Sequence, residues 1–212
     1  MEILAAAITF LVVMSVIKII GGLIDLWGQV ELPEEYNVKL SDTDQEKISA
    51  SKSVIQECFG DNVIEYFRSA NNFQRITMTE EFARRLAKLY DLDVDIDIVV
   101  DEVQKFGVYD WNNKKLKFNI ILLTVEADNA NFDYCVRETI DTIIHELRHA
   151  VQDKAVNNPG FWNVDDETRK LWADNMMPGN YIRPEVDIRA YSEQPIEKDA
   201  FTFSSMIMKG VC

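Results

Sequence analysis

The two histidines of the chain stand four residues apart, and an acid follows the first of them: His145, Glu146 and His149. On an α-helix, positions four apart lie one above the other on the same face, so both imidazoles can reach one metal ion. Glu146 is then placed to act as a base toward a water molecule at that ion. This spacing is typical of zinc metallopeptidases, and the alternative is that it arose by coincidence. We predict a metal centre here.

The motif lies in a segment of about residues 132–152 that the sequence pattern predicts to be a helix. One stripe at 3.6-residue spacing is apolar and is expected to dock on a sheet: Val136, Ile140, Ile143, Ile144, Leu147 and Val151. A different face is polar: Glu138, Thr142, His145, His149 and Gln152. A helix with this layout can present two histidines and an acid to a cleft while its apolar side packs elsewhere.

A catalytic zinc site needs a third protein ligand and one open position for water. The chain has no third histidine, so the ligand must be a carboxylate or come from another chain. Asp153 lies one more turn along the same helix and is poorly placed to close a tetrahedron. Asp165 and Asp166 are possible ligands on a later segment.

Glu197 is the better candidate for the third ligand. Pro195 fits the first turn of a helix, and Ala200 would let that helix approach the motif helix closely. The alternative is that Glu197 is an ordinary first-turn acid, which the helix dipole favours.

The composition of the 212-residue chain indicates a folded, acidic protein. It is 47% hydrophobic and 10% aromatic, with a formal net charge of −14. Such a surface repels phosphate backbones, so no nucleic-acid partner is expected; it favours basic substrates or simply maintains solubility. Cys58, Cys135 and Cys212 are too few and too far apart for a disulfide framework or a cysteine zinc site. Cys135 is predicted to be a core residue.

The N-terminal region is apolar. Residues 3–24 contain one charge, Lys18, and are long enough for a membrane-spanning helix, although a charge within a bilayer is costly. The alternatives are a cleaved signal peptide, or a helix that packs on the domain or lies in the membrane interface. We expect a membrane anchor in residues 1–27, a linker in 28–40 and one domain in 41–212, with a cytoplasmic location if the anchor is absent.

Local patterns predict helices before the motif and a small sheet. A helix begins near Asp42 or Thr43 as cap, a second spans about residues 62–68, and a third covers 79–90 with Thr79 as cap. Residues 91–100 alternate apolar residues with acids, as in a half-buried strand with its aspartates outward. Residues 107–120 read as a hairpin around a turn at 111–114, and a loop at 123–131 leads to the motif helix, capped by Asn131 or Asp133.

These patterns predict an α+β fold in which a small, mostly antiparallel sheet packs on the motif helix. The His145-Glu-x-x-His149 helix, followed by Glu197-x-x-Ala200 on a second helix, resembles the gluzincin arrangement. With residues 107–119 and 191–200, it is similar to the minimal bacterial and phage zincins of the ImmA/IrrE and SprT-like kind. The resemblance covers roughly residues 90–210.

The chain also departs from that pattern. The gap between the second histidine and Glu197 is longer than in compact members, and residues 162–181 are expected to cover the cleft as an insertion. No helix-turn-helix or basic region accompanies the domain, and the hydrophobic N-terminus is atypical of those soluble relatives.

The resemblance implies a zinc-dependent metallopeptidase acting on a peptide or protein, with Zn²⁺ on His145, His149 and Glu197. Glu146 would take a proton from water and later protonate the leaving amine. We expect Tyr191 to donate to the scissile carbonyl, with Tyr181 or Arg189 as alternatives.

Two further roles follow, together with two rival functions. Glu138 or Asp199 is expected to orient a ligand imidazole, and the strand at residues 115–121 to be the sheet edge along which a peptide pairs. The rivals are a catalytically idle zincin scaffold that binds or regulates, and a membrane-anchored structural protein with an incidental motif.

Overall fold

The structure is a computed structural model that describes residues 38–99 and 106–211. The chain divides into two compact units, Met1–Glu34 and Glu35–Cys212, and the described residues belong to the second. The predicted anchor at residues 3–24, most of the linker, and Cys212 lie outside the described residues. Among the residues that are described, no helix is long and apolar enough to cross a membrane.

The domain begins with three helices: α2 (Asp42–Phe59), α3 (Val63–Ser69) and α4 (Asn72–Leu89). The predicted caps Asp42 and Thr43 are wrong by one or two residues, because Ser41 caps α2. The Ser41 hydroxyl accepts a hydrogen bond from the Asp44 N–H at 3.1 Å, and Asp44 Oδ2 accepts from the Ser41 N–H at 2.7 Å. This reciprocal pair satisfies two donors that a helix start would otherwise leave unpaired.

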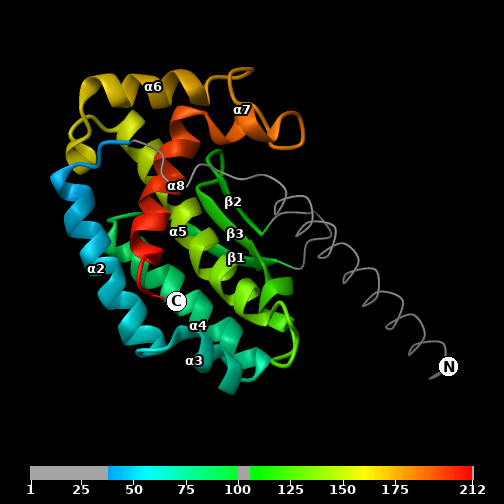
Figure 1. Cartoon of the computed structure of the whole chain (residues 1–212). Coiled ribbons are helices and arrows are strands. Elements are labelled where there is room, and N and C mark those ends of the chain that lie inside the picture. The colour runs from blue at the N-terminus through cyan, green and yellow to red at the C-terminus, as the bar shows by residue number, and fades with distance from the viewer. Residues whose placement is uncertain (1–37, 100–105, 212) are drawn as a thin grey trace. The chain divides into compact units, whose positions relative to one another are not determined.

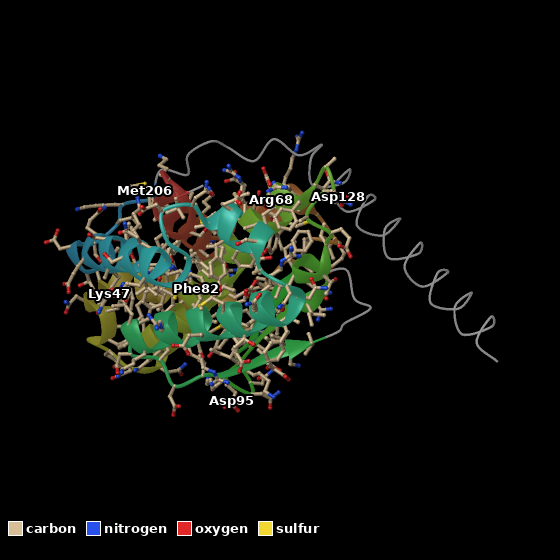
Figure 2. All side chains as sticks on the ribbon, turned by 90° about the horizontal axis from the view of Figure 1, so that it is seen from below. Lys47, Arg68, Phe82, Asp95, Asp128 and Met206 are labelled. Carbon is tan, nitrogen blue, oxygen red and sulfur yellow. The ribbon has the colours of Figure 1, made fainter. Side chains whose placement is uncertain are left out.

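The prediction that Thr79 caps the third helix is wrong. Asn71 caps α4 together with Gln74, so the helix begins eight residues earlier than a cap at Thr79 implies, and Thr79 lies buried in its interior. Arg75, in the added turns, is buried and donates to the carbonyls of Phe67 and Val125. Figure 2 shows the next part of α4, where Phe82 points into the core and is fully buried.

The sheet has three strands in the order β1 (Asp95–Val99), β3 (Lys115–Asn119), β2 (Gly107–Asp110). The predicted hairpin is present, since β2 and β3 pair antiparallel across residues 111–114. β1 pairs with β3 in parallel, so the sheet is mixed, not mostly antiparallel. β3 has a partner on both sides, and the prediction that residues 115–121 form an open edge is therefore wrong.

The motif helix is α5 (Phe132–Asn157), which packs most extensively on α8 (Pro195–Met208). Figure 1 shows the two helices in the centre, with the sheet on one side of them, α2 on the other, and α3 and α4 below them. α4 also contacts β1. The apolar stripe of α5 is buried, with Ile140, Ile143 and Leu147 fully inside, and Cys135 is buried as predicted. The stripe contributes to one core shared with α2, α4 and α8, so the sheet is only part of what it packs against.

Short elements connect these parts: η1 (Ile120–Thr124) follows the sheet, and η2 (Phe161–Asn163), α6 (Asp166–Met176) and α7 (Ile188–Ser192) join α5 to α8. Figure 1 shows α6 and α7 together at one end of the α5–α8 pair. The domain is thus an α+β fold, mostly helical, with a small sheet.

Candidate metal centre

Three buried side chains from α5 and α8 converge on one point. His145 Nε2 lies 3.1 Å from His149 Nε2 and 3.2 Å from Glu197 Oε2, and His149 Nε2 lies 3.4 Å from Glu197 Oε1. The histidines are 6% exposed and Glu197 is fully buried. One ligand atom from each residue lies within 4.8 Å of the others, so the group could hold a metal ion.

The start of α8 explains why Glu197 reaches this point. Gln194 is the N-cap residue and Pro195 is the first residue of the helix, so Glu197 is the third residue and lies in the first turn. Ala200, fully buried one turn later, allows the close packing of α8 on α5. An acid that served only the helix dipole would remain hydrated, whereas this carboxylate is fully buried and faces two imidazoles.

The charges of the three groups support one another. Burial alone would raise the pKa of Glu197, but the charge of His149 and the hydrogen bonds from both histidines hold that pKa well below its usual range. Burial alone would lower the pKa of His149, but Glu197, with smaller contributions from Glu146 and Gln152, raises it to about 9. Below that pH a proton on His149 balances the carboxylate, in the place where a cation would do the same.

The other ring nitrogen of His149 belongs to a buried network. His149 Nδ1 lies 2.8 Å from Gln152 Oε1, and Gln152 Nε2 donates to Ile196 O at 2.8 Å and to Asp199 Oδ2 at 2.7 Å. Asp199 was predicted to orient a ligand imidazole, and the structure places Gln152 between the two.

Arg148 anchors the far end of this network. Its guanidinium donates to both oxygens of Asp199, at 2.7 and 2.9 Å, and to Asp44 Oδ1 of α2 at 2.7 Å. Asp44 also accepts from the Trp162 indole at 2.7 Å. Burial would lower the pKa of Arg148, but Asp199 and then Asp44 raise it, so the cation is permanent.

His145 is held differently from His149. Its ring lies 4.6 Å from the Phe201 ring, and its Nδ1 is buried with no hydrogen-bond partner among the described residues. Asp141 lies one turn earlier on α5. Burial raises its pKa, and the charge of His145 and a hydrogen bond with Ser204 reduce that rise. Glu138, the other residue predicted to orient an imidazole, lies beside Asp141; burial and that neighbour raise its pKa to about 7.

Glu146 faces the sheet. Its Oε2 accepts a hydrogen bond of 2.7 Å from the backbone N–H of Tyr109 on β2. In an antiparallel pair, the backbone groups of successive residues point alternately toward the partner strand and away from it. Val108 pairs with Lys117 of β3, and the backbone groups of its neighbours Gly107 and Tyr109 point to the free side of β2. A Cβ at Gly107 would lie 2.6 Å from the Thr142 methyl and 3.5 Å from Glu146 Cγ, so the glycine allows β2 to approach α5 here.

The two predicted tyrosines lie near the centre. Tyr181 donates to Glu197 Oε1 at 2.9 Å, and its ring contacts those of Tyr191 and Trp111 at 6.2 and 5.7 Å. Burial, followed by the charge of Glu197, raises the pKa of both phenols, so both hydroxyls keep their protons at neutral pH. Arg189, the third candidate donor, is exposed on α7.

The other acids considered as ligands are engaged elsewhere. Asp153 accepts from Tyr109 Oη at 2.8 Å and pairs with Lys114. Asp165 caps α6 by accepting from the Thr168 N–H, and Asp166 pairs with Arg169 at the surface.

Only the C-terminal end of the 162–181 insertion lies over the site. Its first residue, Trp162, and Trp172 of α6 are buried against the Arg148 guanidinium, at 5.7 and 5.6 Å. Tyr181 alone of these residues reaches Glu197. The insertion therefore supports the buried network more than it roofs a cleft.

Comparisons with protein-family models, with curated proteins and with solved structures find no match to this chain. The function is therefore inferred from the site itself. Sequence reasoning missed Arg148, Asp44 and the backbone of Tyr109. The spacing of Gln152, three residues after His149, was the one local signal for the network.

Proposed function

We propose that the protein is a zinc-dependent peptidase of the gluzincin kind, with Zn²⁺ held by His145, His149 and Glu197. The observation that carries the proposal is the buried convergence of these three side chains beside Glu146, a carboxylate outside the group of three. Two imidazoles and one carboxylate are the ligand set of catalytic zinc sites that keep a position for water. A bound zinc ion would lower the pKa of water toward ~7 and polarise a carbonyl.

The residues of the chain supply the remaining parts of the reaction. Glu146 accepts the proton of the attacking water and delivers it to the leaving amine. Both tyrosine hydroxyls stay protonated beside Glu197, and Tyr181 donates to its Oε1. Tyr191 is the donor that we assign to the scissile carbonyl. We propose that an extended peptide pairs along β2, which is an edge strand, because β3 is the central strand and has no free edge. We also propose, as expected from the sequence, that the protein is anchored to a membrane and is of bacterial or phage origin.

One observation favours the idle-scaffold alternative. Glu146 already has a structural partner in the Tyr109 N–H, so a protein without activity would still use this acid to hold β2 on α5. The two functions therefore need a substitution that keeps this hydrogen bond and removes the base.

Glu146→Gln meets that need, because the amide oxygen can still accept from Tyr109. The experiment measures zinc content and cleavage of a random-sequence peptide library by the full chain, with the exposed Glu167→Gln as the matched control. A peptidase predicts one zinc per chain in all three proteins and a ~10²- to 10⁴-fold loss of cleavage in Glu146→Gln alone. Zinc without cleavage in the wild type would support the scaffold, and equal cleavage by Glu146→Gln would exclude the mechanism.

The tyrosines are separated by Tyr181→Phe and Tyr191→Phe. Tyr181→Phe is expected to weaken zinc binding, because Glu197 loses a buried hydrogen bond. Tyr191→Phe is expected to lower kcat at unchanged zinc content, and the opposite pattern would exchange their roles.

A further inference from the structure

The hydrogen bonds of Gln152 determine which of its terminal atoms is the amide nitrogen. One atom contacts Ile196 O at 2.8 Å and Asp199 Oδ2 at 2.7 Å. A backbone carbonyl can only accept, and Asp199, which takes two hydrogen bonds from Arg148, is an ionised acceptor. Both partners are acceptors, so this atom must be the NH₂ group, and the orientation of the amide is fixed by chemistry.

The other terminal atom of Gln152 is therefore its carbonyl oxygen, which can only accept. It lies 2.8 Å from His149 Nδ1, so that nitrogen must carry a proton. A neutral imidazole protonated at Nδ1 has its lone pair on Nε2, and Nε2 is the atom that faces His145 and Glu197. The direction of each hydrogen bond in this series, from Arg148 through Asp199 and Gln152 to His149, follows from the permanent cation at Arg148.

We propose that Gln152 is a positioning residue that, with Asp199 and Arg148, locks His149 in the metal-binding tautomer before any ion arrives. His149, Gln152, Arg148 and Asp199 are all at least nine-tenths buried, so water does not offer the ring a competing partner. His145 gives the contrast: its buried Nδ1 has no hydrogen-bond partner in the described parts of the chain, so no such bond selects its tautomer. The lock itself does not need a metal; its effect on zinc affinity rests on the proposed function.

The first test reads the tautomer directly. Two-bond ¹H–¹⁵N couplings in the untagged, metal-free full chain at pH 10.5 show which nitrogen of each neutral imidazole is protonated. With two histidines in the chain, one His145→Ala variant assigns both patterns. The proposal expects His149 with its proton on Nδ1. A proton on Nε2, or a mixture of the two tautomers, would overturn it.

The second test measures zinc affinity by chelator competition. Gln152→Leu removes both halves of the amide and is expected to weaken zinc binding by about 10- to 100-fold. Ser51→Ala is the matched control, because it loses a buried hydrogen bond to Tyr90 that lies between α2 and the end of α4, and its zinc affinity should not change. Wild-type affinity in Gln152→Leu would overturn the proposal.

A charge exchange separates positioning from general packing. Gln152→Glu keeps the acceptor for His149 but sets two carboxylates against each other, and Asp199→Asn in the same chain restores a donor toward residue 152. The double variant is expected to bind zinc more tightly than either single variant, and additive losses would count against the lock. If Gln152→Leu does not fold, the tautomer of the wild-type chain still decides. A chain with the Nδ1 proton that takes up no zinc would refute the proposed function alone.

Discussion

On one side of the metal centre, α5 and α8 join three ligand atoms to a network of buried charges; on the other, β2 reaches Glu146 through one backbone hydrogen bond. The ligand side is buried, with both histidines 6% exposed and Glu197 fully buried, and charged and hydrogen-bonded side chains hold it in place. The β2 side is a sheet edge with partly exposed neighbours, including Val108 at 39% exposure. Rigid ligands beside a more open acid suit a site that must hold an ion and admit a substrate.

The strongest way to break this contrast is to remove the cation of the network. Arg148→Met leaves the carboxylates of Asp44 and Asp199 buried without their partner, at an expected cost of about 3–5 kcal/mol in the free energy of unfolding. Arg169→Met, which loses an exposed pair with Asp166, should cost less than about 1 kcal/mol. Urea unfolding of the full chain measures both. A similarly small loss of unfolding free energy in both variants would show that the network of buried charges does not stabilise the ligand side.

The sequence predicted the parts of this contrast that have local signals. Helical spacing placed the two histidines on one face, and the lack of a third histidine directed attention to Glu197, which the structure brings beside them. The turn residues at 111–114 predicted the hairpin, but no local pattern tells on which side of it β1 pairs, so the edge was assigned to the wrong strand. Arg148 and Asp44 stand 104 residues apart, and such a pair leaves no trace in a periodicity.

The charge on the ligand side predicts how metal uptake depends on pH. The pKa of His149 is raised to about 9 in the metal-free site, so below pH 9 the ion must displace a proton from that ring. Apparent zinc affinity should fall by about tenfold for each unit of pH from 9 to 6.5. Calorimetry at pH 7.5 in buffers of different ionisation enthalpy should find about one proton released per zinc. Uptake without proton release would mean that Glu197 does not hold the proton on His149.

The close contact between β2 and α5 can be tested by steric change. Gly107→Ala places a Cβ 2.6 Å from the Thr142 methyl and should destabilise the domain by about 1–3 kcal/mol, with lower activity because Glu146 shifts with β2. Thr142→Ser removes that methyl and should recover part of the loss in the double variant. Zinc affinity should remain near wild type in both, since the ligands lie on the other side. A loss of zinc as large as the loss of activity would show that the two sides move together.

The smallest expected effect concerns Glu138, at the edge of the ligand side. Its pKa is raised to about 7 by burial and by Asp141, so the folded state holds this proton more tightly than the unfolded chain does. As pH rises from about 4.5 to 7, the unfolded chain loses the proton first, and the wild-type domain loses stability over that range. Glu138→Gln cannot titrate and should be more stable relative to wild type at pH 7.5 than at pH 4, by about 1 kcal/mol once solvent screening of this partly exposed group is allowed for. If the difference in the free energy of unfolding between the two proteins is independent of pH, burial does not raise the pKa of this carboxylate. The desolvated region of α5 would then end at His145.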